Sequence, residues 1–468
     1  MNRSVKRIVL PALAGLFLVV GCARDTTSPA AAPPVRAAVA AAPGVAGQYL
    51  VLFNGNRVPA DLAARVAALG GKVLFSHDGA ALAGVGGLTA AAAAQLAAGQ
   101  GVADVEADDV IQLEEAQPAI DPDAASATPA SVSNPAGAAS FNRQWDMRAI
   151  HADQAWAVGR LGSSAVTVAI LDTGIDYTGP DLAGHVDLSR SISFVPSDDA
   201  LVDAFFPGRN HVTDLHFHGT HVASTVSSNA SATAGVTTKT TLIAVKICDV
   251  NGSCAFSAII QGVLWAADHG AAVANMSLGG EFSKASNGRF VALFNRTFNY
   301  ARANGTLIVA AAGNAAEDMD HNGNTFNTMC SAPNVVCTSA TGPTGATNVT
   351  LGPWQNVDAP AFYTNFGRSA IDVAAPGGTT FGFVWASCSQ TSLVIPICRT
   401  GFFILGAIGT SMAAPHASGV AALIAEDVGP NPARIKARLE QSSDDLGQPG
   451  TDPFYGKGRV NAAHAVGL

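Results

Sequence analysis

Five short runs of apolar residues constrain the fold of this chain most strongly. They cover residues 166–171, 242–246, 272–276, 307–311 and 371–374. Runs that are apolar without alternation are typical of strands buried on both faces, as in a parallel sheet with helices packed on each side. The sequence therefore predicts an α/β domain with a central parallel sheet over residues 140–468.

A second, smaller unit is predicted before this domain, over residues 47–115. Its elements follow the order strand, helix, strand, strand, helix, strand, which is that of a small ferredoxin-like α+β domain. Segments rich in Ala and Pro flank the unit at residues 23–46 and 116–139. We interpret both as linkers, and the second as an exposed region where processing takes place.

The first 22 residues have the pattern of an export signal peptide. Three basic residues precede an apolar run at residues 8–20, which is too short for a comfortable transmembrane helix. A short buried helix is the alternative, but the polar segment that follows offers it nothing to pack against. Residues 19–22 resemble a bacterial lipobox, which predicts a lipid on Cys22 and a membrane tether before processing. Ala23 then favours the outer membrane, so we expect an exported protein, either extracellular or an outer-membrane-associated lipoprotein precursor.

Composition limits the classes of partner. The chain is 48% hydrophobic and only 13% charged, which is enough apolar material for a large core and too little charge for a disordered chain. The formal net charge is −9, and the sequence has no basic stripe or aromatic platform. A nucleic-acid partner is therefore not expected.

Six cysteines remain when Cys22 is set aside. An even number in an exported protein predicts disulfides, although six cysteines allow 15 pairings, and six buried thiols or a metal site are the alternatives. No Cys-x-x-Cys spacing occurs, which disfavours zinc. The economical pairing joins near neighbours: Cys248 with Cys254, Cys330 with Cys337, and Cys388 with Cys398.

Three segments hold the residue types that nucleophilic catalysis requires. Asp172 follows an apolar run, at the sheet edge where catalytic groups gather in open α/β folds. His218 precedes a helical apolar run, and Ser411 opens a long helix whose positive end stabilises developing negative charge. Each residue has an ordinary alternative, namely a capping aspartate, a metal-binding histidine cluster and an N-cap serine. Their occurrence together in one domain favours catalysis.

The order Asp, His, Ser and the surrounding sequences resemble the subtilisin (subtilase) family of serine peptidases. The matching blocks are Asp-Thr-Gly at 172–174, His-Gly-Thr-His at 218–221 and Gly-Thr-Ser-Met-Ala at 409–413. The resemblance covers residues 140–468, and residues 48–115 are similar to the family's inhibitory propeptide. It implies a three-layer subtilisin-like fold, preceded by the propeptide domain, and a secreted serine endopeptidase made as a self-processing zymogen.

The resemblance also assigns roles to particular residues. Ser411 would be the nucleophile, His218 its general base and Asp172 the group that orients the imidazole, while Asn314 would donate to the oxyanion. The segment expected to pair with extended substrate comprises Ser277, Leu278, Gly279 and Gly280. The family implies protein or peptide substrates, no cofactor for catalysis, a monomer, and the propeptide as intramolecular inhibitor and folding aid.

Structural calcium is a further implication of the resemblance. Asp181 matches an aspartate that contributes to a calcium site in relatives, although Gly179 replaces the usual histidine nearby. A second place is the polar loop before Gly323, whose alternating oxygen ligands would be Asp318, Asp320 and Asn322. Met329 stands where an EF-hand loop has its final acidic residue, so a solvated polar insertion is the alternative.

Two other functions compete with an active endopeptidase. The first is a lipid-tethered inactive peptidase scaffold that acts as a binding protein. The intact set of Asp172, His218, Asn314 and Ser411 argues against it. The second is a lipase or esterase, but Ala413 stands where the Gly-x-Ser-x-Gly elbow has its last glycine, and the order of the three residues differs.

Overall fold

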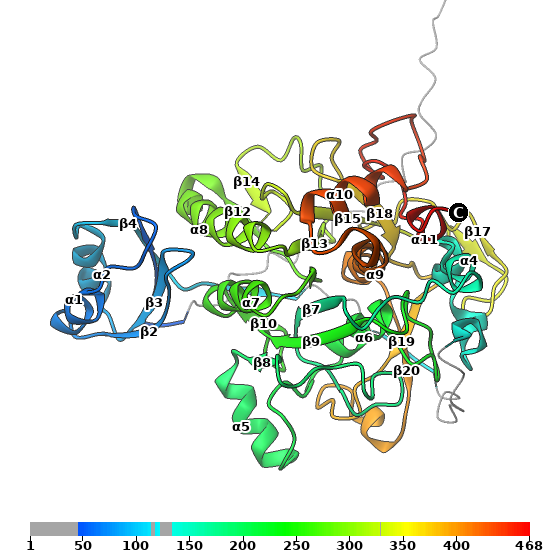
Figure 1. Cartoon of the computed structure of the whole chain (residues 1–468), viewed down its shortest axis with the longest axis horizontal. Coiled ribbons are helices and arrows are strands. Elements are labelled where there is room, and N and C mark those ends of the chain that lie inside the picture. Colours follow the sequence, from blue (N-terminus) through cyan, green and yellow to red (C-terminus); the bar gives the residue numbers. More distant parts are fainter. Residues whose placement is uncertain (1–44, 114–117, 122–132, 328) are drawn as a thin grey trace, which may run out of the picture.

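The chain folds into a small and a large domain (Figure 1). The structure is a computed structural model that describes residues 45–113, 118–121, 133–327 and 329–468. The predicted signal peptide, Cys22 and most of the two linkers lie outside the described residues. Within those ranges, none of the helices has the length and apolar character that a membrane span requires.

The small domain is an antiparallel sheet with two helices. Its elements are β1 (Gln48–Phe53), α1 (Leu62–Ala68), β2 (Lys72–His77), β3 (Leu82–Gly86), α2 (Ala90–Ala97) and β4 (Val102–Ala107). The strands lie in the order β2-β3-β1-β4 and are antiparallel to their neighbours. This is the order of elements that the sequence predicts for the segment.

Strand β1 shows how the small domain uses both faces of its sheet. Val51 and Phe53 pack against Leu62 and Val66 of α1 in the domain's own core. Leu50 and Leu52 point the other way and join a core cluster of the large domain, which includes aromatic residues of α8 (Lys284–Ala303). The sheet therefore docks on the large domain through an apolar face, as its position beside α7 and α8 in Figure 1 illustrates.

The large domain is built on a parallel sheet of seven strands. They are β7 (Thr167–Asp172), β8 (Ile192–Ser193), β9 (Thr241–Lys246), β11 (Val273–Met276), β13 (Leu307–Ala311), β15 (Val336–Thr341) and β18 (Val373–Pro376). Their order is β18-β15-β13-β11-β7-β9-β8. The five predicted runs all lie in this sheet, which confirms the predicted α/β fold with a central parallel sheet.

Helices cover both faces of the sheet, which completes the three layers. Within β7, Val168 and Ile170 pack into the core that contains α6 (His218–Val226) and α9 (Thr410–Val428). The alternate residues Ala169 and Leu171 pack into the core that contains α7 (Phe256–Asp268) and α8. Because strand side chains alternate between faces, a run that is apolar throughout serves both cores.

The remaining elements are short or lie at the surface. The helices are η1 (Pro135–Gly137), η2 (Phe141–Arg143), α3 (Trp145–Ala149), α4 (Ala152–Ala157), α5 (Pro196–Phe205), η3 (Pro396–Thr400), α10 (Pro432–Gln441) and α11 (Ala462–Ala465). The strands are β5 (Val110–Gln112), β6 (Ala119–Ile120), β10 (Ser253–Ala255), β12 (Glu281–Ser283), β14 (Thr325–Asn327), β16 (Gly345–Ala346), β17 (Trp354–Gln355), β19 (Val384–Ser387) and β20 (Ile404–Ala407).

Three disulfides join the near-neighbour cysteines, in the pairing that sequence economy favours. They are Cys248–Cys254, Cys330–Cys337 and Cys388–Cys398. The first closes the turn that carries β10. The third closes the loop between β19 and β20, whose buried residues Cys388 and Cys398 pack against Phe217, next to His218.

The calcium ligand expected at Asp181 has a different role in the structure. Asp181 is fully buried, and its Oδ1 accepts hydrogen bonds from the backbone of Ser231 and Ala232 at 2.7 and 2.9 Å. Its Oδ2 accepts from Thr233, through backbone and hydroxyl, and from the Ser387 hydroxyl at 2.8 Å. The lone pairs that would coordinate a cation are therefore taken up by N–H and O–H donors, and the residues do not fit a calcium ion.

The second calcium expectation fails for a similar reason. Asp318 accepts a hydrogen bond from the backbone of Asp320 and contacts Nδ1 of His321 at 2.8 Å. The carboxylate of Asp320 turns instead to the backbone and hydroxyl of Ser369. The described residues contain no group of three or more His, Cys, Asp or Glu side chains that could hold a metal. The loop of Asp318, Asp320 and Asn322 is thus better described as a hydrogen-bonded surface insertion.

Replacing Asp181 should destabilise the protein, whereas chelation should not. In Asp181→Asn, an amide N–H would face several donors, so we expect the free energy of unfolding to fall by about 2–4 kcal/mol. Excess EDTA should leave the melting temperature of the wild type unchanged. Scanning calorimetry measures both effects. The control is Asp203→Asn, which removes an exposed ion pair with His211 and should cost less than about 1 kcal/mol. If EDTA lowers the melting temperature strongly and Asp181→Asn leaves the stability unchanged, the calcium interpretation is restored.

Candidate active site

Asp172 and His218 form a buried contact at the carboxyl end of β7. Both side chains are fully buried, and Oδ1 of Asp172 lies 2.8 Å from Nδ1 of His218. The same oxygen accepts a hydrogen bond from the backbone of Thr173 at 2.7 Å. Because an ionised carboxylate only accepts, Nδ1 carries the hydrogen, and Nε2 is the basic nitrogen of the neutral ring. The arrangement orients the imidazole and stabilises it when it becomes protonated.

Two glycines allow the start of α6 to approach the end of β7. A Cβ on Gly219 would lie 2.1 Å from the carbonyl oxygen of Gly174, which no side chain could tolerate. Gly174 itself has φ +113°, and a Cβ there would lie 2.5 Å from the carbonyl oxygen of Val212. The backbone of Gly219 also donates to Oγ1 of Thr173 at 3.0 Å. The position of His218 relative to Asp172 is therefore fixed by backbone packing.

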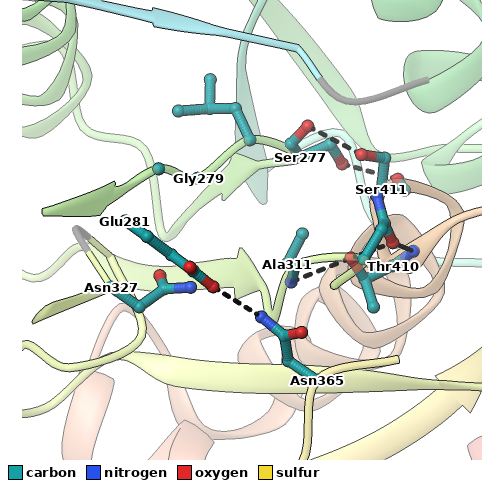
Figure 2. A pocket seen from close by; sticks show the side chains of 12 residues that line it. Ser277, Gly279, Glu281, Ala311, Asn327, Asn365, Thr410 and Ser411 are labelled. Atoms are coloured by element: carbon teal, nitrogen blue, oxygen red, sulfur yellow. Dashed lines mark hydrogen bonds between the residues drawn. The ribbon is translucent and has the colours of Figure 1, made fainter. Parts of the chain in front are cut away.

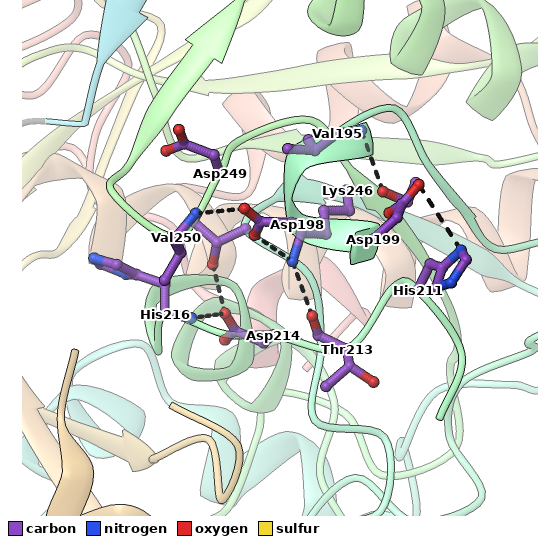
Figure 3. Close-up of polar contacts among 12 residues, drawn as sticks. Val195, Asp198, Asp199, His211, Thr213, Asp214, His216, Lys246, Asp249 and Val250 are labelled. Carbon is purple, nitrogen blue, oxygen red and sulfur yellow. Dashed lines mark hydrogen bonds and ion pairs between the residues drawn. The ribbon is translucent and has the colours of Figure 1, made fainter. Parts of the chain in front are cut away.

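A buried carboxylate supports the segment that leads to His218 (Figure 3). Asp214 accepts hydrogen bonds from the hydroxyls of Thr173 and Thr220, at 2.9 and 2.6 Å, and from the backbone of His216 at 2.9 Å. Burial raises the pKa of Asp214 and lowers the pKa of His216. The hydroxyl bonds tie the turn after β7 to the first turn of α6, which limits movement of His218.

A buried ion pair lies beside this cluster. Nζ of Lys246 lies 2.8 Å from Oδ2 of Asp198 and donates to the carbonyl of Thr213 at 2.9 Å. Lys246 is paired in register with Asp172 across β7 and β9. Figure 3 draws the pair between α5 and the segment of Thr213 and Asp214. Because an unpaired buried charge is costly, this contact fastens α5 to the sheet below the Asp172–His218 contact.

Ser411 lies in the first turn of α9, next to residues 277–280, the segment that the sequence predicts to pair with substrate and that is called the predicted substrate strand below. In the structure this segment joins β11 to β12 and is not itself a strand of the sheet. Oγ of Ser411 donates to the carbonyl oxygen of Ser277 at 3.1 Å, and Oγ of Ser277 donates to the carbonyl oxygen of Ser411 at 2.7 Å. Ser411 is 7% exposed, which leaves it accessible at the end of an otherwise buried helix turn. The N-terminus of α9 adds a positive partial charge there.

Asn314 lies beside the same helix terminus. Its Oδ1 accepts hydrogen bonds from the backbone and the hydroxyl of Thr410, both at 2.9 Å. These two bonds fix the orientation of the planar side-chain amide. Because Oδ1 faces the start of α9, the NH₂ group of Asn314 points away from Thr410. The neighbouring Gly313 donates its N–H to Oγ1 of Thr410 at 3.0 Å.

A pocket opens directly beside Ser411 (Figure 2). The predicted substrate strand and Asn314 lie in its wall, so the structure brings these expected residues together. The lining residues are Ser277, Leu278, Gly279, Gly280, Glu281, Ala311, Gly313, Asn314, Asn327, Asn365, Thr410 and Ser411. The side chain of the residue before a scissile bond would enter such a pocket when its carbonyl carbon approaches Ser411.

The last strand of the small domain reaches the edge of this pocket. Strand β5 pairs antiparallel with β10, with Ile111 opposite Cys254. A Cβ on Gly280 would lie 2.6 Å from Cγ2 of Ile111, so this side chain packs directly on the predicted substrate strand. Chain that leaves the small domain thus runs in extended form beside the residues expected to bind substrate.

Three residues of the pocket did not emerge from the sequence. Glu281 directly follows the predicted substrate strand, and this position alone could have drawn attention to it. Asn327 and Asn365 come from segments with no recognisable pattern. Their amide nitrogens donate to the carbonyl of Ala312 at 3.1 and 3.0 Å, a contact that only the fold creates.

Comparison with known proteins identifies the relatives of the chain. Residues 163–458 match the subtilase family. The chain is 32% identical to thermitase from Thermoactinomyces vulgaris over 69% of this chain and 96% of thermitase. It is 31% identical to subtilisin DY from Bacillus licheniformis, over 68% of this chain and 96% of that protein.

Solved structures agree on the fold. Fervidolysin from Fervidobacterium pennivorans, described as a keratinolytic enzyme related to subtilisin, aligns with a TM-score of 0.66 and 24% identity. That alignment covers 90% of this chain and 61% of fervidolysin. A mutant of the epidermin leader peptide processing serine protease from Staphylococcus aureus aligns with a TM-score of 0.68 and 21% identity, over 90% of this chain and 99% of that protein. From these relatives and this fold, the chain belongs to the subtilase family and is a subtilisin-like serine endopeptidase.

Proposed function

We propose that Asp172, His218 and Ser411 are the catalytic triad of this endopeptidase. The observation that carries the proposal is the buried 2.8 Å contact between Asp172 and Nδ1 of His218, together with Ser411 at the mouth of a pocket. Ser411 Oγ attacks the carbonyl carbon of a peptide, and Nε2 of His218 takes its proton. The same proton is then given to the leaving amine, while Asp172 stabilises the imidazolium.

Asn314 and the N-terminus of α9 would stabilise the oxyanion. The NH₂ group of Asn314 supplies one donor, and the backbone N–H of Ser411 supplies the second. The pinned orientation of the amide supports this role, because a donor that is already oriented needs no rearrangement as charge develops. Ser277 to Gly280 would hold the substrate as an added strand, which suits extended peptides rather than small esters.

The small domain would be an inhibitory propeptide and folding aid. The contact of Ile111 with Gly280 supports this, because the domain's last described strand occupies the expected binding edge. Processing in the linker at residues 116–139 would then separate the small domain from the peptidase. Structural neighbours that cover 90% of this chain include more than the large domain, which agrees with a two-domain precursor.

Export and lipidation complete the proposal. The signal pattern of residues 1–22 supports export, and Cys22 would carry a lipid that tethers the precursor. Because Cys22 lies on the propeptide side of the linker, processing would release the peptidase domain, as a monomer, from the membrane. The alternative, a tethered inactive scaffold that binds proteins, is disfavoured by the hydrogen-bonded geometry of Asp172, His218 and Asn314.

The intact mass of the exported protein beside that of Ser411→Ala tests self-processing. We expect the wild type to lose its first ~115–140 residues, the span of the small domain and exposed linker, and the variant to stay whole. Equal trimming of both would mean that another protease does the processing. If neither is trimmed and no peptide is cut, the inactive scaffold becomes the better description.

The same samples also test whether processing separates the peptidase from the lipid on Cys22. We expect lipid on Cys22 to stay with the released small domain and the active peptidase to carry none. Mass spectrometry of both fractions measures this. Active peptidase that is still covalently joined to Cys22 would contradict the proposed release.

Asn314→Ala tests the oxyanion role. We expect kcat to fall roughly 10²- to 10³-fold with little change in KM, which is the loss known for such a donor in a subtilisin. Steady-state kinetics on a peptide substrate give both constants. The matched control is Asn304→Ala at the exposed end of α8, which should keep full activity. A change in KM alone would instead indicate a role in ground-state binding.

A further inference from the structure

The pocket beside Ser411 presents hydrogen-bond acceptors that lack donors. Oδ1 of Asn327, in the pocket wall, is buried without a hydrogen-bond partner in the described structure. The same holds for Oε2 of Glu317, which lies behind the wall and is not part of the pocket lining. Oε1 of Glu281, which lies in the pocket wall, has one long contact of 3.4 Å with Nδ2 of Asn365 (Figure 2). Since buried acceptors without donors are costly, this group of atoms calls for a donor-rich partner.

Two carboxyl groups meet at this end of the pocket. Glu281 from β12 and Glu317 from the loop after β13 lie within hydrogen-bonding reach. Burial, and then the contact with Glu317, raise the pKa of Glu281 to about 8. Asn327 of β14 and Asn365 face the pair with neutral amides. Among the described residues that line the pocket, none is a Lys, Arg or His, so no cationic side chain of the pocket wall pairs with Glu281.

We propose that Glu281, together with Glu317, makes this endopeptidase select a Lys or Arg side chain on the acyl side of the scissile bond. An ammonium group brings three donors and a guanidinium group five, which matches a pocket end made of acceptors. The proposal rests on the proposed function, because the pocket selects substrate only if Ser411 attacks beside it. Glu281 is the specificity-determining residue, since it lies in the pocket wall itself.

Other side chains fit this pocket end less well. An apolar side chain would leave the acceptors of Glu281 and Asn327 without a good donor, and sites built for hydrogen bonds reject analogues that lack the polar group. An acidic side chain would add a third carboxyl group to the pair. A cation instead pairs with the carboxylate of Glu281 and favours its ionised form.

Self-processing in the linker would have to take place at a bond without the preferred side chain. Residues 114–142 contain no Lys or Arg, so they offer no preferred bond to a second enzyme molecule. A single cut within the same molecule remains feasible, because effective molarities of about 10⁵–10⁸ M for well-oriented groups outweigh a roughly 100-fold loss of side-chain preference. The new N-terminal segment is then protected from further trimming.

Hydrolysis of matched peptides by the mature wild type tests the preference. The peptides differ only in the acyl-side residue, which is Lys, Arg, norleucine or Glu. We expect kcat/KM for Lys and Arg to exceed that for norleucine by roughly 10- to 100-fold, the value of a charged hydrogen bond. In Glu281→Gln this ratio should fall by about 10-fold or more.

The pH dependence of the ratio separates recognition from fold effects. A carboxyl group with a raised pKa is protonated at pH 6 and ionised at pH 9, and only the ionised form pairs with a cation. The Lys-to-norleucine ratio should therefore rise between these pH values in the wild type and stay flat in Glu281→Gln. Hydrolysis of both peptides depends in the same way on the protonation state of His218, so this dependence cancels in the ratio of the two rates. Glu440→Gln is the matched control, because this carboxyl on α10 also has a pKa raised by burial but does not line the pocket.

Three outcomes would overturn the proposal. One is a wild type that prefers norleucine or Glu, and another is a Lys-to-norleucine ratio that survives in both Glu281→Gln and Glu317→Gln. If Glu440→Gln changes the ratio as much as Glu281→Gln, the effect is not local to the pocket. A wild type that cuts none of the peptides would overturn the proposed function as well, which distinguishes the two failures.

Discussion

The close approach of two backbone segments, at Gly174 and Gly219, is the constraint on which the site depends. It brings the end of β7 against the start of α6, so that Asp172 and His218 meet with no freedom in the backbone between them. The parallel sheet supplies the rest, since the carboxyl ends of its strands open on one edge. The helix that carries Ser411 packs on one face of the sheet with its N-terminus at this edge, and the pocket forms between that terminus and the segment of residues 277–280.

Buried charge is used sparingly around this edge and is paired wherever it occurs. Asp172 is paired with His218, Asp198 with Lys246, and Asp214 with a set of hydroxyl and backbone donors. Each carboxylate would destabilise the domain if it stood alone. Because His218, Lys246 and Thr173 come from segments other than those of the carboxylates that they contact, these contacts also fix how the segments around the site are arranged.

The sequence predicts those strands of the central sheet that are continuous apolar runs, and it misses strands with polar residues among them. Strand β15 escaped prediction because Cys337, Thr338 and Ser339 interrupt its apolar character, although all of its residues are buried. The residues proposed for catalysis could be named because each stands in a local sequence block. Glu281 and Asn365 could not be assigned a role, because their place in the pocket depends on contacts between distant loops.

The hydrogen bonds of Asp181 do not fit the expected calcium ion, for a reason that the sequence cannot reveal. The residue is of the right type, but its hydrogen-bond donors come from residues 231–233 and from Ser387, more than 200 positions away. Whether a carboxylate binds a cation or a set of N–H groups depends on the loop that folds over it. Similar residues in relatives thus need not perform the same structural task.

The disulfide between Cys248 and Cys254 makes the turn against which β5 pairs dependent on the redox state of the surroundings. The bridge closes the turn that carries β10, the strand with which the end of the small domain pairs. In a thiol-rich cytoplasm this bond would be reduced and the turn would lose its covalent closure. Under the proposed export, the turn would gain its covalent closure only after the chain has left the cytoplasm.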